Sequence, residues 1–240
     1  MPLVDESRLV GGEPAFGPWQ VATAPGLLGL LGYPGAVGRG PDSPFILAID
    51  GRGAGGKSTL ARTIVDATPQ SALVHTGDLA WNEPFFQWAH LLREVLETLR
   101  AGNSLNLRPP AWEREGRPGA VALPAGLSLV VVEGVGASQC DVVELVDAVI
   151  WVQSDFSVAE QRGIERDIAE GVNGNRDETI TFWHEWMSHE LAFLERERPW
   201  ERAAAIVLGT PASGVVPPGK LAVHLSPGAR RSAGNRDSGT

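Results

Sequence analysis

One short segment constrains the fold more than any other part of the chain. Residues 45–50, FILAID, are almost entirely apolar, and the glycine-rich GRGAGGKST of residues 51–59 follows directly. From Gly51 to Ser58 the chain fits the pattern G-x-x-x-x-G-K-[ST]. A continuous apolar run of this length is typical of a buried strand, and the residues after Lys57 have helical spacing. The segment therefore predicts a strand, a tight turn and a helix in that order.

The predicted turn has the chemistry of a phosphate-binding loop. Its glycines let successive backbone N–H groups point inward, and the helix N-terminus adds partial positive charge. In this pattern the lysine contacts the β and γ phosphates of a nucleotide, and the serine hydroxyl is a ligand of Mg²⁺. The alternative is a glycine-rich turn with an incidental lysine. We expect these residues to hold the nucleotide: Gly51, Arg52, Gly53, Ala54, Gly55, Gly56, Lys57, Ser58 and Thr59.

Apolar runs alternate with helix-like segments through the rest of the chain. Continuous apolar runs indicate buried strands, which we expect at residues 45–50, 72–76, 127–134, 147–153, 203–208 and 220–225. Helical spacing of apolar residues indicates helices, which we expect at residues 57–68, 85–102, 156–171 and 177–197. This alternation favours right-handed crossovers and a parallel sheet. We therefore predict an α/β, three-layer P-loop NTPase fold with a mainly parallel sheet, helices on both faces and a small helical lid.

Composition divides the chain into three parts. Residues 1–43 are rich in Gly and Pro and contain one apolar patch, GLLGLLG, so we expect an arm that packs at the patch and is irregular elsewhere. Residues 44–225 carry the alternating pattern of strands and helices and form the P-loop domain. Residues 226–240 lack large apolar groups, which predicts a disordered tail.

Charge and hydropathy limit the partners. The formal net charge of −9 argues against nonspecific binding to nucleic acid. No apolar run reaches the roughly 20 residues of a membrane helix, so we expect no membrane partner. The start of the chain lacks a secretion signal, and the single cysteine, Cys140, cannot form an internal disulfide. Both observations favour a cytoplasmic protein. We expect Cys140 to be a small buried residue, as free cysteines often are. The sequence is compatible with a monomer or a homo-oligomer.

Absent motifs separate the classes of phosphate-loop protein. A GTPase switch would need N-K-x-D, and a transporter ATPase would carry LSGGQ; the chain has neither. These absences favour a kinase. For a kinase we expect ATP and Mg²⁺ as cofactors and a hydroxyl of a small molecule as acceptor. A regulatory ATP-binding ATPase without phosphoryl transfer is the main alternative. A purely structural domain is hard to reconcile with an intact phosphate loop.

From about residue 45 to about residue 208 the chain resembles the uridine kinase and phosphoribulokinase group of P-loop kinases. The resemblance rests on five segments in the family order: HTGDLAW, LETLRAG, RPPAWEREGR, LVVVEG and RGIERD. It implies that Asp78, at the end of the strand beside the phosphate loop, is the catalytic base. A carboxylate there would accept the proton of the acceptor hydroxyl. A helix-capping aspartate is the alternative.

The resemblance also assigns the metal site and the lid. Glu133 follows an apolar strand and would bind Mg²⁺ together with Ser58 and contact the substrate. The alternative is that Glu133 only caps a loop. Arg162 and Arg166 lie four residues apart, so on a helix they share a face and could close over the phosphates during catalysis together with Lys57. Surface arginines paired with neighbouring acids are the alternative. Arg176 is a weaker lid candidate in a loop that we expect to be mobile.

The acceptor segment departs from the family pattern. The family's Tyr-Asp-Phe triplet is replaced by AWE at residues 111–113, and the second lid arginine is Gly163. Uridine therefore cannot be assumed as the acceptor. Trp112, Arg114 and Arg117 remain candidates for substrate binding, because an aromatic face beside guanidinium groups suits a base or a sugar. We expect a nucleoside or nucleoside-like compound first, then another hydroxylated metabolite, then a pantothenate-like acid.

Two aromatic segments, WNEPFFQW at 81–88 and FWHEWMSHE at 182–190, allow a second interpretation. His184 and His189 lie near acids, but five residues place them on different helix faces, whereas a zinc pair needs four. We therefore expect a helix whose aromatic stripe packs on the sheet and whose acids face water. His75 is expected to end a strand.

Overall fold

The computed structural model describes residues 8–35, 43–212 and 214–226. The strands are β1 Gln20–Ala22, β2 Phe45–Gly51, β3 Ser71–His75, β4 Leu105–Leu107, β5 Val121–Leu123, β6 Leu129–Glu133, β7 Ala148–Gln153, β8 Ala205–Leu208 and β9 Leu221–Leu225. The α-helices are α1 Ala24–Leu30, α2 Lys57–Asp66, α3 Thr76–Ala80, α4 Ala89–Arg100, α5 Pro110–Arg114, α6 Phe156–Glu170 and α7 Arg176–Glu197. Within the described residues, short 3₁₀ helices include Val143–Leu145 and Pro199–Glu201.

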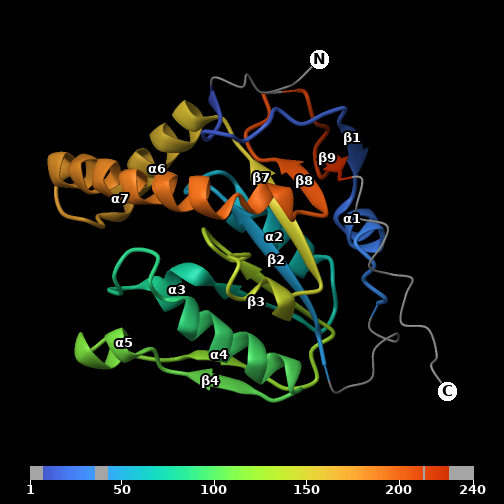
Figure 1. The fold of residues 1–240 in the computed structure, drawn as a ribbon, viewed down its shortest axis with the longest axis horizontal. Coiled ribbons are helices and arrows are strands. Elements are labelled where there is room, and N and C mark those ends of the chain that lie inside the picture. Colours follow the sequence, from blue (N-terminus) through green and yellow to red (C-terminus); the bar gives the residue numbers. More distant parts are fainter. Residues whose placement is uncertain (1–7, 36–42, 213, 227–240) are drawn as a thin grey trace.

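A seven-stranded sheet in the order β1-β9-β8-β7-β2-β6-β3 forms the centre of the molecule. The strands from β8 to β3 in this order are parallel, whereas β9 and β1 add an antiparallel edge. Strands β4 and β5 form a separate antiparallel pair. Helices lie on both faces of the sheet (Figure 1). The predicted α/β class with a mainly parallel sheet is thus confirmed.

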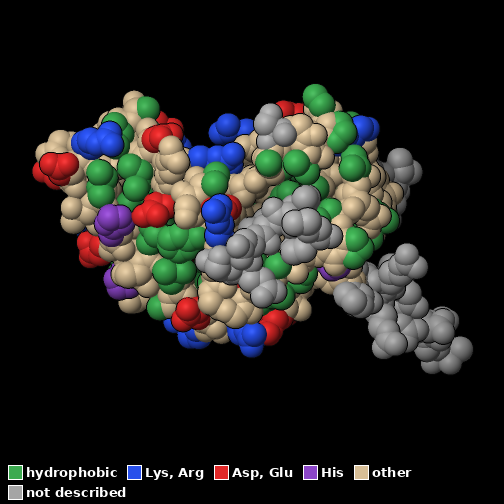
Figure 2. All heavy atoms as spheres, turned by 90° about the horizontal axis from the view of Figure 1, so that it is seen from above, with side chains coloured by type: hydrophobic (Ala, Val, Ile, Leu, Met, Phe, Trp, Pro, Cys, Tyr) green, Lys and Arg blue, Asp and Glu red, His purple; other side chains and the backbone are tan. Residues whose placement is uncertain are grey.

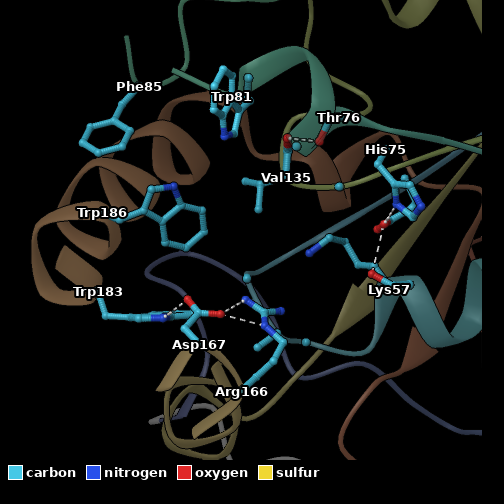
Figure 3. Close-up of a pocket in the computed structure, with 18 of the residues that line it drawn as sticks. Lys57, His75, Thr76, Trp81, Phe85, Val135, Arg166, Asp167, Trp183 and Trp186 are labelled. Atoms are coloured by element: carbon cyan, nitrogen blue, oxygen red, sulfur yellow. Dashed lines mark hydrogen bonds and ion pairs between the residues drawn. The ribbon is translucent and has the colours of Figure 1, made fainter. Parts of the chain in front are cut away.

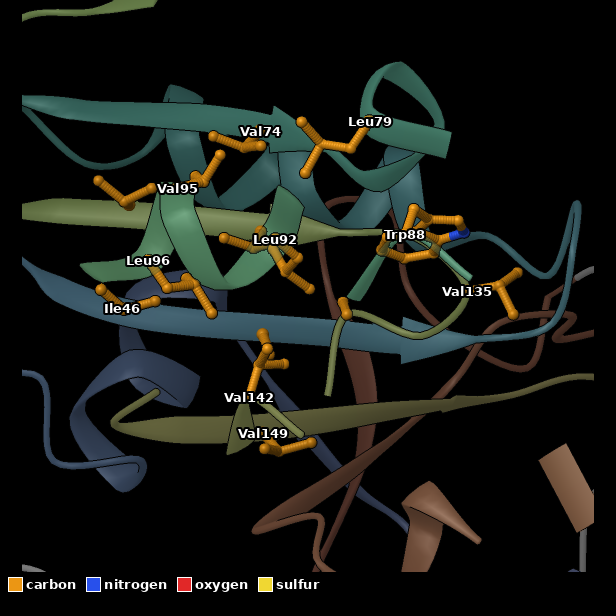
Figure 4. Close-up of a cluster of buried hydrophobic side chains, with 14 of the residues drawn as sticks. Ile46, Val74, Leu79, Trp88, Leu92, Val95, Leu96, Val135, Val142 and Val149 are labelled. Carbon is orange, nitrogen blue, oxygen red and sulfur yellow. The ribbon is translucent and has the colours of Figure 1, made fainter. Parts of the chain in front are cut away.

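Strand β2 shows why the sequence pattern is a continuous apolar run. Side chains alternate between the faces of a strand, so Ile46 and Ala48 join one core with α4, and Leu47 and Ile49 join another with α1 and α2. Figure 4 shows Ile46 beneath Leu92, Val95 and Leu96 of α4. Each such Leu or Ile side chain contributes roughly 1.5–3 kcal/mol when fully buried. Burial on both faces fixes β2 at the centre and with it the start of the phosphate loop.

Helix α4 begins at Ala89, four residues later than the sequence predicts. Before it, Asn82 and Phe86 have left-handed backbone conformations, with φ of 55° and 58°. Such angles are incompatible with a right-handed helix. The Phe86 ring is instead stacked on Phe193 of α7, with ring centroids 4.3 Å apart. Residues 81–88 therefore form a turn that connects α3 and α4 and contacts α7.

The N-terminal arm is more regular than its Gly and Pro content indicates. Strand β1 pairs with β9, so the expectation of an irregular arm is wrong for this segment. The apolar patch does pack on the domain, because Leu27 and Leu28 of the short helix α1 are buried against the sheet. Of the predicted tail, all residues after Ser226 lie outside the described residues.

A buried carboxylate attaches the arm to the end of β7. Glu13 accepts hydrogen bonds from Trp151 Nε1 at 2.6 Å and Gln153 Nε2 at 2.8 Å. Arg8 forms an ion pair with Asp155, the N-cap of α6, at 3.0 Å. The arm therefore contacts both the sheet and the first helix of the predicted lid.

Two sequence expectations about the molecular surface have separate outcomes. Cys140 is exposed, so its interpretation as a small buried residue is wrong. None of the helices in the described part of the chain combines the length and hydrophobicity required to cross a bilayer.

Helices α6 and α7 form one packed unit that projects beside the sheet (Figure 1). Asp155 caps α6, and a capping box between Asn175 and Glu178 begins α7. Where the two helices touch, Trp183 Nε1 donates to the buried Asp167 carboxylate at 2.7 Å. The Trp183 ring occupies the space above Gly163, where any Cβ atom would overlap it. An arginine, which the family pattern has at this position, would therefore not fit beside Trp183, and glycine does.

We expect Gly163→Ala to lower the free energy of unfolding by about 1–3 kcal/mol, because the added methyl forces Trp183 out of its position. Urea denaturation measures the difference. The matched control is Gly29→Ala in α1, where an added Cβ meets nothing within 4 Å and helix propensity favours Ala. Equal stability of the Gly163→Ala variant and the wild type would contradict the packing described for α6 and α7.

Candidate active site

The loop between β2 and α2 opens into one large cavity. Gly56 is the N-cap of α2 and has a φ of 103°, a conformation that favours glycine. Residues 53–59 line the cavity, which has a volume of about 1480 Å³. Single-ligand pockets usually measure about 300–1000 Å³. The cavity is therefore large enough for a nucleotide and a second compound.

Lys57 lies at the centre of this loop and is buried. Its Nζ donates to the backbone oxygen of Arg52 at 2.5 Å. Burial lowers the pKa of the Lys57 ammonium, and the nearby carboxylates of Glu133, Glu190 and Asp50 oppose this effect. The Lys57 ammonium is therefore held at the loop, and the three carboxylates offset part of the cost of burying its charge.

Ser58 and Glu133 come from α2 and β6 and meet at the cavity wall. Ser58 Oγ donates to Glu133 Oε1 at 3.0 Å, so both oxygens can reach one cation. Hydroxyl and carboxylate oxygens are ligands that Mg²⁺ accepts, and its remaining ligands are usually water and phosphate oxygens. No cluster of three or more His, Cys, Asp or Glu side chains suited to a metal occurs within the described residues. The pair therefore fits a magnesium ion that is bound together with a nucleotide.

His75 ends β3, as expected, and lines the same cavity. Its Nδ1 lies 2.5 Å from Glu133 Oε1. This hydrogen bond raises the pKa of His75. Burial alone would raise the pKa of Glu133, but the contacts with His75, Lys57 and Ser58 outweigh it and hold that pKa below its ordinary value. The two groups therefore stabilise each other as an ion pair.

The ion pair predicts a pH-dependent stability difference. Its contribution is lost as the pH falls through the lowered pKa of Glu133 and as it rises through the raised pKa of His75. In metal-free buffer, the melting temperature of His75→Ala should therefore fall furthest below the wild type between pH 4.5 and 6.5, the ordinary pKa values of the two groups. The difference should shrink at higher pH. The exposed His90→Ala is the control, and a difference that does not vary with pH would contradict the ion pair.

Asp50, at the end of β2, is fully buried and supports the loops around the cavity. Its carboxylate accepts hydrogen bonds from the backbone N–H groups of Gly51, Gly136 and Ser138 and from the Ser138 hydroxyl, at 2.8–2.9 Å. Burial raises the pKa of Asp50, and these hydrogen bonds oppose the rise. The side chain therefore joins the start of the phosphate loop to the segment after β6.

Glu190 of α7 is a functional candidate that the sequence interpretation missed. This fully buried carboxylate accepts from the Gly53 backbone N–H at 2.6 Å and from Arg52 Nη2 at 3.3 Å. Arg52 is also buried and lies over the Phe156 ring of α6, 3.8 Å from its centroid. Glu190 therefore fixes the phosphate loop to the helix pair, contrary to the expectation that the acids of this helix face water.

Asp78 does not lie where the sequence places it. Strand β6 separates β3 from β2, so β3 is not beside the strand that enters the phosphate loop. Asp78 lies in the short helix α3 after β3, and its carboxylate pairs with Arg117 at 2.6 Å. The side chain lies next to the cavity rather than in its wall. The Asp78 carboxylate is held by Arg117 in this structure, and its catalytic role stays a prediction.

Trp112 of α5 and Arg117, which follows this helix, hold Asp78 and α3 in position. Trp112 is buried, and its Nε1 donates to the Asp78 backbone oxygen at 2.9 Å. The Arg117 guanidinium lies over the Trp112 ring, 3.7 Å from its centroid. Of the three predicted acceptor contacts in this segment, Arg114 lines the cavity, whereas Trp112 and Arg117 hold α3 in place.

Arg162 and Arg166 lie on one side of α6 and line the cavity, as their spacing predicts. Arg166 also pairs with Asp167 at 2.7 Å, which matches the alternative interpretation of a surface ion pair. Arg176 is the first residue of α7 and lies outside the cavity wall. The structure therefore brings two of the three lid candidates to the phosphate loop.

Figure 2 shows basic side chains gathered in the hollow near the middle of one face of the molecule.

The aromatic stripe of α7 faces the phosphate loop and the cavity, and its expected position against the sheet is wrong for these residues. Phe182, Trp183 and Trp186 line the cavity, and the Trp186 ring fills the space beside Gly53. His184 pairs with Glu160 of α6 at 3.3 Å, and His189 packs on Phe85. His184 thus pairs with an acid and His189 packs on a ring, and the two histidines do not form a common site.

Comparison with known proteins agrees with this arrangement. The chain is 28% identical, over 195 aligned residues, to a uridine kinase from Halobacterium salinarum, with 71% of this chain and 82% of that protein covered. The solved structure of a protein assigned as a fructose transport system kinase, from Silicibacter sp., has a TM-score of 0.52 at 16% identity, with 75% of this chain and 92% of that chain covered. No protein-family model matches. The chain is therefore related to a uridine kinase, and its fold is that of P-loop kinases.

Proposed function

We propose that the protein is a small-molecule kinase that transfers the γ-phosphoryl group of Mg·ATP to a hydroxyl of a nucleoside, a nucleoside-like compound or another small metabolite. One observation carries the proposal. A phosphate loop with Lys57 and the Ser58–Glu133 pair shares a single cavity of about 1480 Å³ with a second, aromatic-lined region. The relationship to a uridine kinase supports the same reaction class.

In the proposed reaction each group of the chain has a separate task. The loop amides and Lys57 bind the phosphates, and Arg162 and Arg166 approach them from α6. Bound Mg²⁺, held by Ser58 and Glu133, would neutralise charge on the phosphate oxygens. The phosphoryl group passes to the acceptor oxygen in line with the leaving ADP oxygen, and the hydroxyl proton goes to a carboxylate, for which we propose Asp78.

The proposed partners follow from the same chemistry. The acceptor is a small molecule, and neither nucleic acid nor a membrane takes part. We propose a cytoplasmic location, where ATP is available. A regulatory ATPase is the competing function, because the family's acceptor triplet is replaced at residues 111–113.

We expect Asp78→Asn to lower phosphoryl transfer about a hundredfold, because an amide cannot accept the hydroxyl proton. ADP release with and without a pool of nucleosides and other alcohols measures it, and ATP binding should be unchanged. Asp66→Asn at the end of α2 is the control. Wild-type ADP release that does not depend on any alcohol would favour the regulatory ATPase, and full activity of Asp78→Asn would exclude Asp78 as the base.

A further inference from the structure

We propose that the acceptor carries a flat, largely apolar ring system of at least two fused aromatic rings, a proposal that rests on the kinase function above. Its binding surface is an aromatic wall, which we define as Trp81, Phe85, Phe86, Phe182 and Trp186. All members of the wall line the cavity that contains the phosphate loop. Figure 3 shows Trp81, Phe85 and Trp186 across the open space from Lys57 and His75.

The aromatic wall is built from two segments far apart in sequence. Residues 81–88 and helix α7 meet through ring contacts of Phe85 with Phe182 and of Phe86 with Trp186, at centroid distances of 6.1 and 6.3 Å. Trp186 also contacts the phosphate loop at Gly53. A compound on this wall would therefore lie close to the bound phosphates.

The rings of the wall keep faces that the protein does not cover. Phe182 is 37% exposed, and the other members of the wall are partly exposed. An exposed phenyl ring is ordinary by itself, whereas apolar rings gathered around one cavity are typical of a ligand site. Aromatic rings bind flat ring systems by stacking and edge contacts.

The backbone of the 81–88 segment is consistent with a built site. Asn82 and Phe86 have φ values of 55° and 58°, which non-glycine residues seldom adopt. Each such conformation costs on the order of 1 kcal/mol and occurs more often at functional sites. The stack of Phe86 on Phe193 holds this turn in place, which leaves Trp81 and Phe85 directed at the cavity.

The wall contains few groups that could identify a nucleobase. Apart from indole N–H groups, Asn82 and Glu83 are the only polar side chains that these two segments contribute to the cavity within the described residues. A site that selects a base needs complementary hydrogen bonds to its edges. The wall instead selects for ring area and shape, and this favours an aromatic alcohol over uridine.

The test uses 2-(2-naphthyl)ethanol, its saturated-ring analogue 2-(2-decalyl)ethanol, and uridine as probes for the full chain with Mg·ADP. Calorimetry measures binding, and mass spectrometry measures transfer from Mg·ATP. We expect the naphthyl probe to bind at least about tenfold more tightly than uridine or the saturated analogue. Phe85→Leu and Phe182→Leu should each weaken it about fivefold or more, as loss of a stacking ring does. Phe16→Leu, which removes a half-buried ring outside the cavity, should have no effect.

The outcomes separate the two proposals. The aromatic-acceptor inference would be overturned if uridine bound more tightly than the naphthyl probe, or if both wall variants bound the naphthyl probe as tightly as the wild type. In either case, phosphoryl transfer to uridine would still support the kinase function. If the naphthyl probe bound to the wall but no alcohol were phosphorylated, the wall would still be a site for flat aromatic compounds, and the kinase function would be contradicted.

Discussion

Lys57→Ala should lower phosphoryl transfer about a thousandfold and leave the fold intact. Within the phosphate loop, the Lys57 side chain lines the cavity, and its loss removes a positive charge where negative charge develops on the transferred group. Stability should change little, because two effects oppose each other: burial disfavours the charged form of Lys57 and lowers its pKa, whereas Glu133, Glu190 and Asp50 lose a nearby positive charge. Steady-state kinetics and thermal denaturation of the same preparation measure both effects.

The matched control is the other lysine of the chain, Lys220, just before β9 and outside the cavity wall. Lys220→Ala removes the same charge and should leave transfer and stability unchanged. If Lys57→Ala retained wild-type activity, residues 51–59 could not be the phosphate-binding loop of the reaction.

Glu190→Ala should lower the free energy of unfolding by about 3–5 kcal/mol. Removal of one partner leaves Arg52 buried and without its counter-charge, and this is costly in a protein interior. Among the described residues, Nε and Nη1 of Arg52 already lack hydrogen-bond partners, so no second carboxylate replaces Glu190. The Gly53 N–H would also lose its acceptor. Equilibrium unfolding in urea measures the loss.

A double variant distinguishes the charge effect from lost packing. Arg52→Met combined with Glu190→Leu removes both charges and keeps apolar volume, so it should recover most of the stability lost in Glu190→Ala. A loss below about 1 kcal/mol for Glu190→Ala, or a double variant that is no more stable than the single one, would contradict the described role of Glu190.

The central strands and the phosphate loop could be predicted from the sequence because their signals are local. Strand β2 is buried on both faces and therefore reads as a continuous apolar run. The glycine pattern of the loop follows it directly and α2 begins at Lys57, as the motif requires. A pattern in which strand, turn and helix each support the same structure leaves few alternatives.

Features that depend on strand order and long-range contacts could not be predicted in this way. Insertion of β6 between β2 and β3 moves Asp78 away from its expected place, and no local pattern encodes this order. The role of Glu190 depends on a partner 137 residues away in the sequence. An acid at a position that shares a helix face with buried residues, such as Trp183 and Met187, was the available signal.

The aromatic residues illustrate a different limit. Their helical spacing indicates one stripe on α7, in which Trp183 is buried and Phe182 and Trp186 are partly exposed. Spacing does not identify the surface opposite the stripe. That surface includes the phosphate loop and the 81–88 turn, where Phe86 takes a conformation that its residue type does not suggest. The acceptor side of the cavity could therefore be described only from the structure.

The most direct test of a kinase is a mass-spectrometric search for phosphorylated products. The wild-type protein and Lys57→Ala are incubated in parallel with Mg·ATP and a pool of nucleosides, aromatic alcohols and cell metabolites. A kinase should convert at least one alcohol to a compound heavier by one phosphoryl group, in the wild type and not in the variant. Binding of ATP by the wild type with release of phosphate alone, at a rate that no alcohol changes, would contradict the proposed function.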